Sequence, residues 1–115
     1  MIWTKTTYVP VRIRRGKWMV AIRYDQRDHL GNAQTVYNCD VVPYTETDEN
    51  GIDHDWGTIC GRPGESARDV CLRALETPGP WWFDSEAHAR YECEFRNECV
   101  EEYNAEYLER FGSNA

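Results

Sequence analysis

The chain has 115 residues, a length that fits one domain with a single hydrophobic core. Apolar residues make up 41% and aromatic residues 13% of it, a composition that excludes a largely disordered protein. The formal net charge is −7, and no stretch approaches the ~20 apolar residues of a membrane span or the apolar core of a signal peptide. We therefore expect a single cytoplasmic domain over residues 1–115.

Residues 1–60 predict an antiparallel sheet. Over residues 6–14, apolar and polar side chains alternate with the period of two that places one row against a core. Residues 15–17 supply a tight turn, and the alternation resumes over residues 18–24, which together predict a hairpin. A third strand is expected over residues 35–41.

The segment that follows is acidic and contains one turn signal. Residues 43–55 include Asn50-Gly51 and predict a loop or a loose hairpin, after which residues 56–60 form a short fourth strand. Pro63-Gly64-Glu65-Ser66 then opens a helix over residues 64–76. Its apolar positions repeat at three and four residues, so we expect this helix to cover one face of the sheet.

The strongest periodic pattern predicts a long helix over residues 84–111, capped by Asp84 or Ser85. At 100° per residue, its side chains separate into an aromatic side and an acidic side. The aromatic side carries Cys93, Phe95, Cys99, Val100, Tyr103, Tyr107 and Phe111, and the acidic side carries Glu94, Glu98, Glu101, Glu102, Glu106 and Glu109. With this helix, the predicted elements give the fold class α+β: a three- to four-stranded antiparallel sheet followed by a short helix and a long C-terminal amphipathic helix.

The acidic side of this helix is the first candidate binding surface. Like charges three and four residues apart destabilise a helix, so the glutamate row is more than a solvated face requires. Clustered carboxylates attract a basic protein surface and can imitate a phosphate backbone. Trp81, Trp82 and Phe83 precede the helix, and because three consecutive large side chains cannot all face a core, Trp81 or Trp82 is a candidate anchor for the same partner.

The first hairpin is the alternative candidate surface. Residues 1–24 contain no Asp or Glu, so the basic residues of the chain's first part stand apart from its acidic remainder. Cations contact phosphates and an aromatic ring stacks on a base, which makes this hairpin a candidate nucleic-acid site. Pairing with the chain's own carboxylates, or docking on an acidic protein, are the other interpretations. The candidate residues are Arg12, Arg14, Arg15, Lys17 and Trp18.

Motifs of catalysis and metal binding are missing from the sequence. It contains no glycine-rich phosphate loop, no serine elbow and no His-Glu-x-x-His. The 5 cysteines are widely spaced without a Cys-x2-Cys pair, a pattern that favours free buried thiols over disulfides or a zinc site. We therefore expect a protein that is not an enzyme, with no catalytic residue, no cofactor and no metal site.

In its layout, the chain resembles the small α+β inhibitors made by phages and mobile elements, including anti-CRISPR proteins. The resemblance covers the order of the elements: antiparallel strands, a short helix opening at residues 63–67, and a long acidic helix. It implies a non-enzymatic protein that inhibits a nucleic-acid-handling complex of the host's defence. The protein would act by occluding the surface of that complex or by mimicking nucleic acid. The partner would be a host protein or ribonucleoprotein complex with a basic surface.

Two alternatives from other classes stay open. One is a nucleic-acid-binding module that uses the basic hairpin. The other is a self-associating structural or assembly protein, a homodimer formed through the aromatic side of the long helix.

Overall fold

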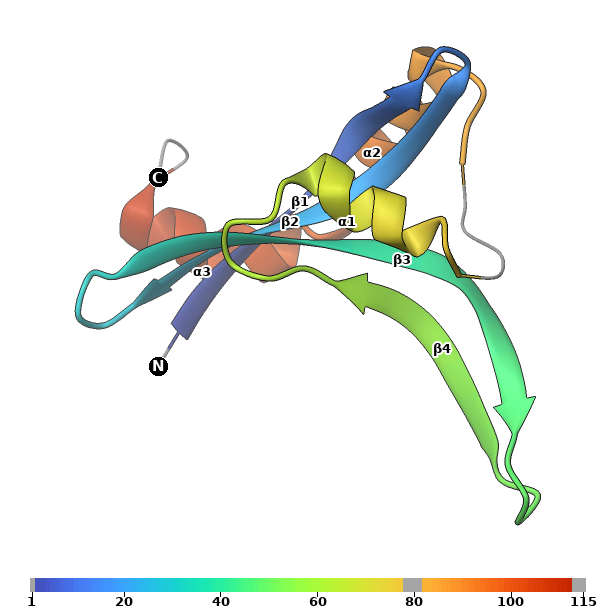
Figure 1. Cartoon of the computed structure of the whole chain (residues 1–115). Coiled ribbons are helices and arrows are strands. Elements are labelled where there is room, and N and C mark those ends of the chain that lie inside the picture. Colours follow the sequence, from blue (N-terminus) through green and yellow to red (C-terminus); the bar gives the residue numbers. More distant parts are fainter. Residues whose placement is uncertain (1, 78–81, 113–115) are drawn as a thin grey trace.

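The computed structural model describes residues 2–77 and 82–112, without the side chains of residues 42–46 and 53–56. It confirms the α+β class, because a four-stranded antiparallel sheet is followed by helices (Figure 1). The elements are β1 (Ile2–Arg14), β2 (Lys17–Asp28), β3 (Ala33–Thr47), β4 (Asp53–Cys60), α1 (Ala67–Ala74), α2 (Glu86–Cys99) and α3 (Glu101–Phe111).

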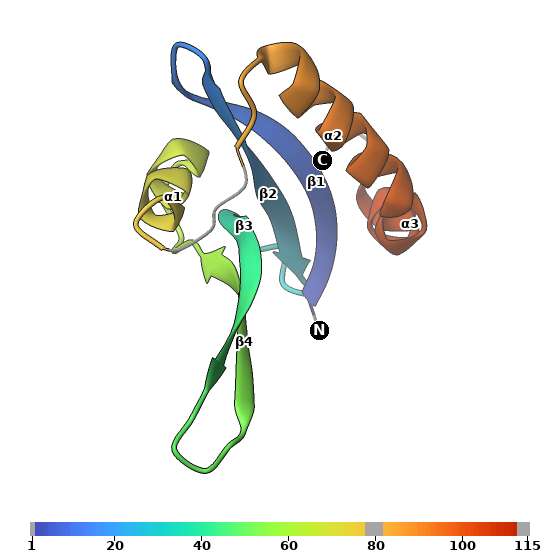
Figure 2. The same cartoon turned by 90° about the vertical axis from the view of Figure 1, so that its right-hand side faces the viewer.

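The strands follow one another in the order β1-β2-β3-β4. The predicted first hairpin is confirmed: β1 and β2 pair along almost their whole length and are joined by Arg15 and by Gly16, whose φ of 74° favours glycine. Strands β2 and β3 pair only between Ile22 and Arg27 of β2, next to the turn that joins them, and they diverge on the other side of Ile22. The expected loop or loose hairpin over residues 43–55 is a hairpin, and its two strands project from the body as an arm (Figures 1 and 2).

The main core lies between one face of the sheet and α1. Alternate residues of the strands point into it, as the period-two pattern predicts, and α1 contributes three side chains that are fully buried. Ser66 caps α1 by accepting a hydrogen bond from the backbone N–H of Asp69 at 3.1 Å. The chain reaches α1 through Gly61, where a Cβ atom would lie 2.0 Å from the carbonyl oxygen of Tyr37. The core residues are Val11, Ile13, Met19, Ala21, Cys39, Val41, Val70, Cys71 and Ala74.

The single long helix expected over residues 84–111 is instead two helices, α2 and α3, which meet at Val100. Ser85 is the cap of α2, with its hydroxyl oxygen accepting from the N–H of His88 at 3.2 Å. At Val100 the backbone leaves helical geometry, with φ of −105° and ψ of 4°, and α3 runs in a different direction from α2 (Figures 1 and 2). A β-branched residue between closely spaced glutamates is a weak point in a helix, so the break falls where propensity is low.

Helices α2 and α3 lie along the outer edge of β1 (Figure 2). One asparagine in each helix bonds to the backbone of this edge strand. The N–H of Thr6 donates to Asn104 Oδ1 at 2.7 Å, and Asn104 Nδ2 donates to the carbonyl of Thr6 at 2.7 Å. Asn97 makes the same pair of bonds with Tyr8, at 2.7 and 3.1 Å. The two side chains therefore occupy the hydrogen-bonding positions that a further strand would take.

Replacing Asn104 with Ala should lower the free energy of unfolding by about 2–4 kcal/mol, because it removes two hydrogen bonds and leaves two backbone groups of Thr6 unpaired. Chemical denaturation measures the loss. Asn50→Ala is the matched control: this exposed asparagine contacts Asp48 through its backbone N–H, and its replacement should cost less than about 0.5 kcal/mol. Equal losses in the two variants would show that Asn104 does not hold α3 to β1.

All 5 cysteines are free, but they occupy two environments. Cys39, Cys71 and Cys93 are buried, and Cys60 and Cys99 are exposed, so the expectation of buried thiols is wrong for these last two. The pKa of Cys71 is raised by its hydrogen bond with Cys39 and by burial. Burial also raises the pKa of Cys93 to about 11. Cys71 and Cys93 are therefore poor nucleophiles at neutral pH.

We expect a thiol reagent to modify Cys60 and Cys99 rapidly in the native protein and the other three cysteines only at the rate at which the fold opens. Mass spectrometry of peptides after brief alkylation measures this directly. All five thiols should react together in denaturant. Rapid labelling of Cys71 or Cys93 in the native state would contradict the packing described above.

Candidate functional site

The outward surface of α2 and α3 carries the predicted glutamate row. All six of these side chains are exposed. Glu106 accepts a hydrogen bond from Trp3 Nε1 at 3.2 Å and lies 3.6 Å from Arg110 Nε. Within the described part of the chain, the other members of the row form no ion pair: Glu94, Glu98, Glu101, Glu102 and Glu109.

Large aromatic side chains lie on the same outward surface. Tyr91 is 72% exposed, Phe95 57% and Tyr103 80%. The expected separation of an aromatic side from an acidic side is therefore wrong for Phe95 and Tyr103, and also for the exposed Cys99. The buried side instead passes through Ala89, Cys93, Asn104 and Tyr107, and Asn104 bonds to β1. We call this exposed set of glutamates and aromatic rings the acidic helix surface.

Trp82 lies at the first hairpin and not within the acidic helix surface. Phe83 pairs with Trp18 through two backbone hydrogen bonds of 2.7 Å, which fix the segment before α2 against β2. Trp82 is 52% exposed, and Lys17 Nζ lies 5.1 Å from the centre of its ring. The glutamate row and Trp82, which were predicted to bind one partner together, are thus separate in the structure. Trp82 lies instead beside the residues of the alternative hairpin site. Trp81, the other predicted anchor, is outside the described residues.

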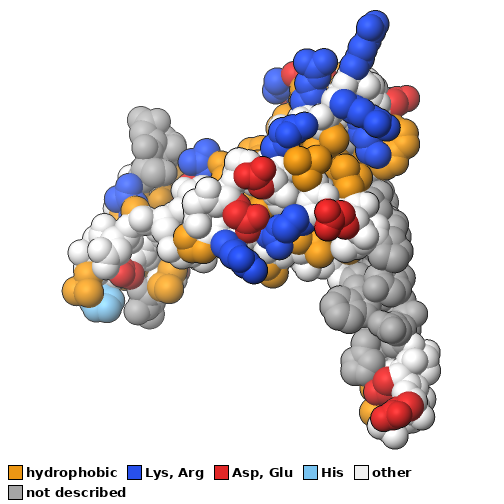
Figure 3. Space-filling model, viewed as in Figure 1, with side chains coloured by type: hydrophobic (Ala, Val, Ile, Leu, Met, Phe, Trp, Pro, Cys, Tyr) orange, Lys and Arg blue, Asp and Glu red, His pale blue; other side chains and the backbone are white. Residues whose placement is uncertain are grey.

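The cations of the hairpin gather at one end of the molecule (Figure 3). Arg12, Arg14 and Arg15 are exposed. Arg68 of α1 approaches the same hairpin and donates to the carbonyl oxygen of Ile13 at 3.1 Å. No carboxylate whose side chain the structure describes forms an ion pair with any of these arginines or with Lys17.

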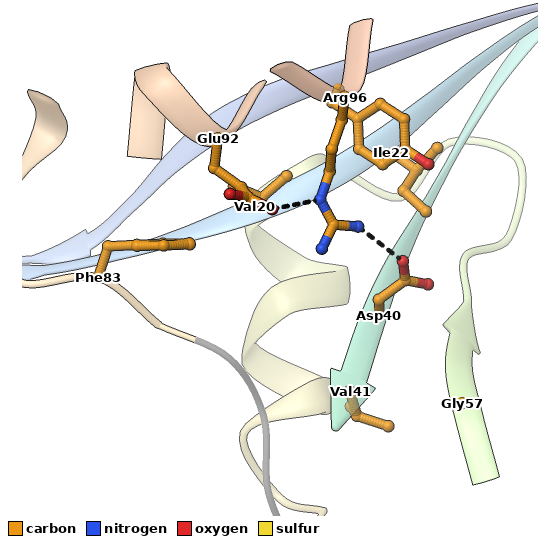
Figure 4. A pocket seen from close by; sticks show the side chains of 9 residues that line it. Val20, Ile22, Asp40, Val41, Gly57, Phe83, Glu92 and Arg96 are labelled. Carbon is orange, nitrogen blue, oxygen red and sulfur yellow. Dashed lines mark hydrogen bonds and ion pairs between the residues drawn. The ribbon is translucent and has the colours of Figure 1, made fainter. Parts of the chain in front are cut away.

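A cavity of about 320 Å³ opens where β2 and β3 diverge. Figure 4 shows Arg96 of α2 reaching across it, with Nε 2.7 Å from Glu92 and Nη1 3.4 Å from Asp40. The guanidinium group also lies 5.4 Å from the ring centre of Tyr8. The cavity is lined by Tyr8, Val20, Ile22, Asp40, Val41, Gly57, Phe83, Glu92 and Arg96.

In this cavity the positive charge of Arg96 is paired with the carboxylates of Glu92 and Asp40. Partial burial by itself would lower the pKa of Arg96, but the hydrogen bond and charge of Glu92 raise it above the ordinary value. Among the described residues that line it, none is a histidine, cysteine, serine or threonine that would act as a nucleophile or as its base. In the described residues, no group of three or more His, Cys, Asp or Glu side chains is placed to hold a metal ion.

The sequence prediction missed Arg96, Asn97, Asn104 and Tyr91. A signal for the asparagines was present, because both fall on the helical stripe that also carries Cys93 and Tyr107, and a polar residue on a buried stripe needs a partner. Tyr91 precedes Phe95 by four residues, one turn of a helix. Arg96 follows Glu92 by four residues, which indicates their ion pair, but its contact with Asp40 of a distant strand has no signal along the chain.

No protein-family model, curated protein or solved structure matches the chain. Among the helices of the described residues, none is both long and apolar enough to cross a membrane.

The two tyrosines of α3 should respond very differently to truncation. Tyr107 is 2% exposed and Tyr103 is 80% exposed, so Tyr107→Ala should cost about 3–5 kcal/mol of unfolding free energy and Tyr103→Ala less than about 0.5 kcal/mol. Thermal or chemical denaturation of the two variants measures the difference. Similar costs would mean that α3 is rotated relative to the orientation described here.

Proposed function

We propose that the chain is a non-enzymatic binding protein whose acidic helix surface occupies a basic, nucleic-acid-binding surface of a host complex, as inhibitors made by phages and mobile elements do. The observation that carries the proposal is the combination on one surface of unpaired carboxylates with exposed aromatic rings. Each feature alone has a structural explanation. Together they supply the long-range attraction and the desolvated anchor that a protein interface needs.

The arrangement of the carboxylates supports this function. Glu94 and Glu98 are four residues apart in α2, and Glu102 and Glu106 are four residues apart in α3. Each such like-charge pair destabilises its helix by about 0.2–0.5 kcal/mol, a cost that a partner's cations would reverse. Four residues of helix span about 6 Å, so the surface presents negative charges at regular steps along its length. A basic groove that binds phosphates can accept such a row.

The aromatic rings support a protein partner in particular. Tyr91, Phe95 and Tyr103 are exposed on the helices that carry the carboxylates. Tyrosine and phenylalanine are enriched in the cores of protein interfaces and depleted on free surfaces, and they contribute most where water is excluded around them. We therefore expect Phe95 or Tyr103 to lie at the centre of the contact and the glutamates to form its rim.

The test uses a variant that removes charge without disturbing a bond in the described structure: Glu94→Gln, Glu98→Gln and Glu109→Gln together. Tagged wild-type chain should capture a complex from a nuclease-treated lysate of the host and release it between about 50 and 500 mM salt, and the triple variant should capture at least tenfold less. The purified complex should then bind its own nucleic acid at least tenfold more weakly when the chain is present.

The matched control neutralises three exposed acids elsewhere, Glu49→Gln, Glu76→Gln and Asp84→Asn, and should capture the complex as the wild type does. Equal capture by the wild type and the Glu94/Glu98/Glu109 variant would reject the acidic helix surface as the contact. A captured complex that keeps its full affinity for nucleic acid would reject inhibition by occlusion. Sedimentation of the purified chain as a dimer that Phe95→Ala converts to a monomer would instead assign the surface to self-association.

A further inference from the structure

The basic hairpin tip consists of Arg12, Arg14, Arg15, Lys17 and the ring of Trp82, and it is arranged at a cost to the fold. In the β1–β2 ladder, Arg14 lies directly opposite Lys17, with only Arg15 and Gly16 between them. Like charges directly across a ladder destabilise a hairpin. The described residues provide no carboxylate to offset this repulsion. A bound anion would offset it.

The acidic residues nearest to Trp82 in the sequence have partners of their own. Asp84 lies 3.2 Å from His88 Nδ1, and Glu86 lies 2.6 Å from Arg90 Nη2. Both pairs form at the start of α2, and neither includes a cation of the hairpin. The cations of the tip are thus left for a ligand even though the segment beside them is acidic.

The net charge of −7 does not prevent an anion from approaching this tip. The molecule extends 44 × 41 × 26 Å, whereas charges in physiological salt are screened beyond about 8 Å. No residue of β1 up to Arg14, nor of β2 before Asp25, is acidic. An approaching anion therefore experiences the local field of the hairpin rather than the average charge of the chain.

Trp82 adds a stacking surface to these cations. It is 52% exposed, and the backbone bonds between Phe83 and Trp18 hold its position in the chain against β2. Lys17 Nζ lies 5.1 Å from the centre of the Trp82 ring, and Arg12 lies opposite Trp18, the residue to which Phe83 is bonded. A base can stack on an exposed indole only when it is unpaired, while its flanking phosphates contact arginine and lysine.

We infer that the hairpin tip and Trp82 form a binding site for single-stranded nucleic acid, independent of the acidic helix surface. The phosphates of the strand contact Arg12, Arg14, Arg15 and Lys17, and one base stacks on Trp82. Recognition is of the backbone and an exposed base, without a preferred sequence.

Fluorescence anisotropy with a labelled deoxythymidine strand of about 20 nucleotides tests the site. We expect a Kd of about 1–100 μM near 50 mM salt, and a slope of log K against log salt of about −3 if four cations contact phosphates. The double variant Arg14→Gln with Arg15→Gln should make that slope shallower by about 1.4, because two phosphate contacts are lost. Trp82→Ala should weaken binding by about 5- to 100-fold and leave the slope unchanged, which separates stacking from charge.

Lys5→Gln with Arg62→Gln is the control, since it removes the same charge from cations outside the hairpin tip and should change the slope far less. Absence of binding near 50 mM salt would overturn the inference. So would a Trp82→Ala variant that binds as the wild type does, or a control pair that matches the effect of the Arg14/Arg15 pair. If the Arg14/Arg15 pair instead abolishes self-association, the tip contacts the acidic helix surface of a second copy and the inference is likewise wrong.

Discussion

The contact of two asparagines with the edge of β1 determines where the helices lie. An edge strand presents unpaired N–H and C=O groups that invite another strand, and this chain satisfies those of Thr6 and Tyr8 with side-chain amides. Each amide both donates and accepts, so it bonds a residue of the strand as a paired backbone would. The helices are thereby attached beside the sheet, and their opposite side is left facing solvent.

The break at Val100 follows from the same attachment. Asn97 precedes it and Asn104 follows it, so each helix is held to β1 by its own asparagine. A straight helix and a twisted strand diverge over a long contact, and a change of direction between the two asparagines lets both bonds form. The acidic helix surface is consequently bent and follows the edge of the sheet (Figure 2).

The sequence was most informative where one local pattern decides the structure. The alternation that places Val11 and Ile13 in the core depends on neighbours along the chain and was predictable. The short helix was also predictable, but its expected range of residues 64–76 was too long, because α1 begins after its cap at Ser66 and spans only Ala67–Ala74. The orientation of the last helices was not predictable, because helical periodicity defines faces without saying which one meets a strand. Phe95 and Tyr103 were expected on a common face with Tyr107, and only the tertiary bonds of Asn97 and Asn104 decide that Tyr107 alone of these three rings turns inward.

The attachment to β1 also separates the acidic helix surface from the cations of the hairpin. The glutamates point away from the sheet because the asparagines point toward it, and the cations lie at the hairpin end beyond the start of α2. Where carboxylates of α2 do find cations, as in the pairs of Glu86 with Arg90 and Glu92 with Arg96, the partner lies four residues along the same helix. Among the described side chains, the glutamates of the acidic helix surface and the cations of the hairpin tip consequently form no ion pair with one another.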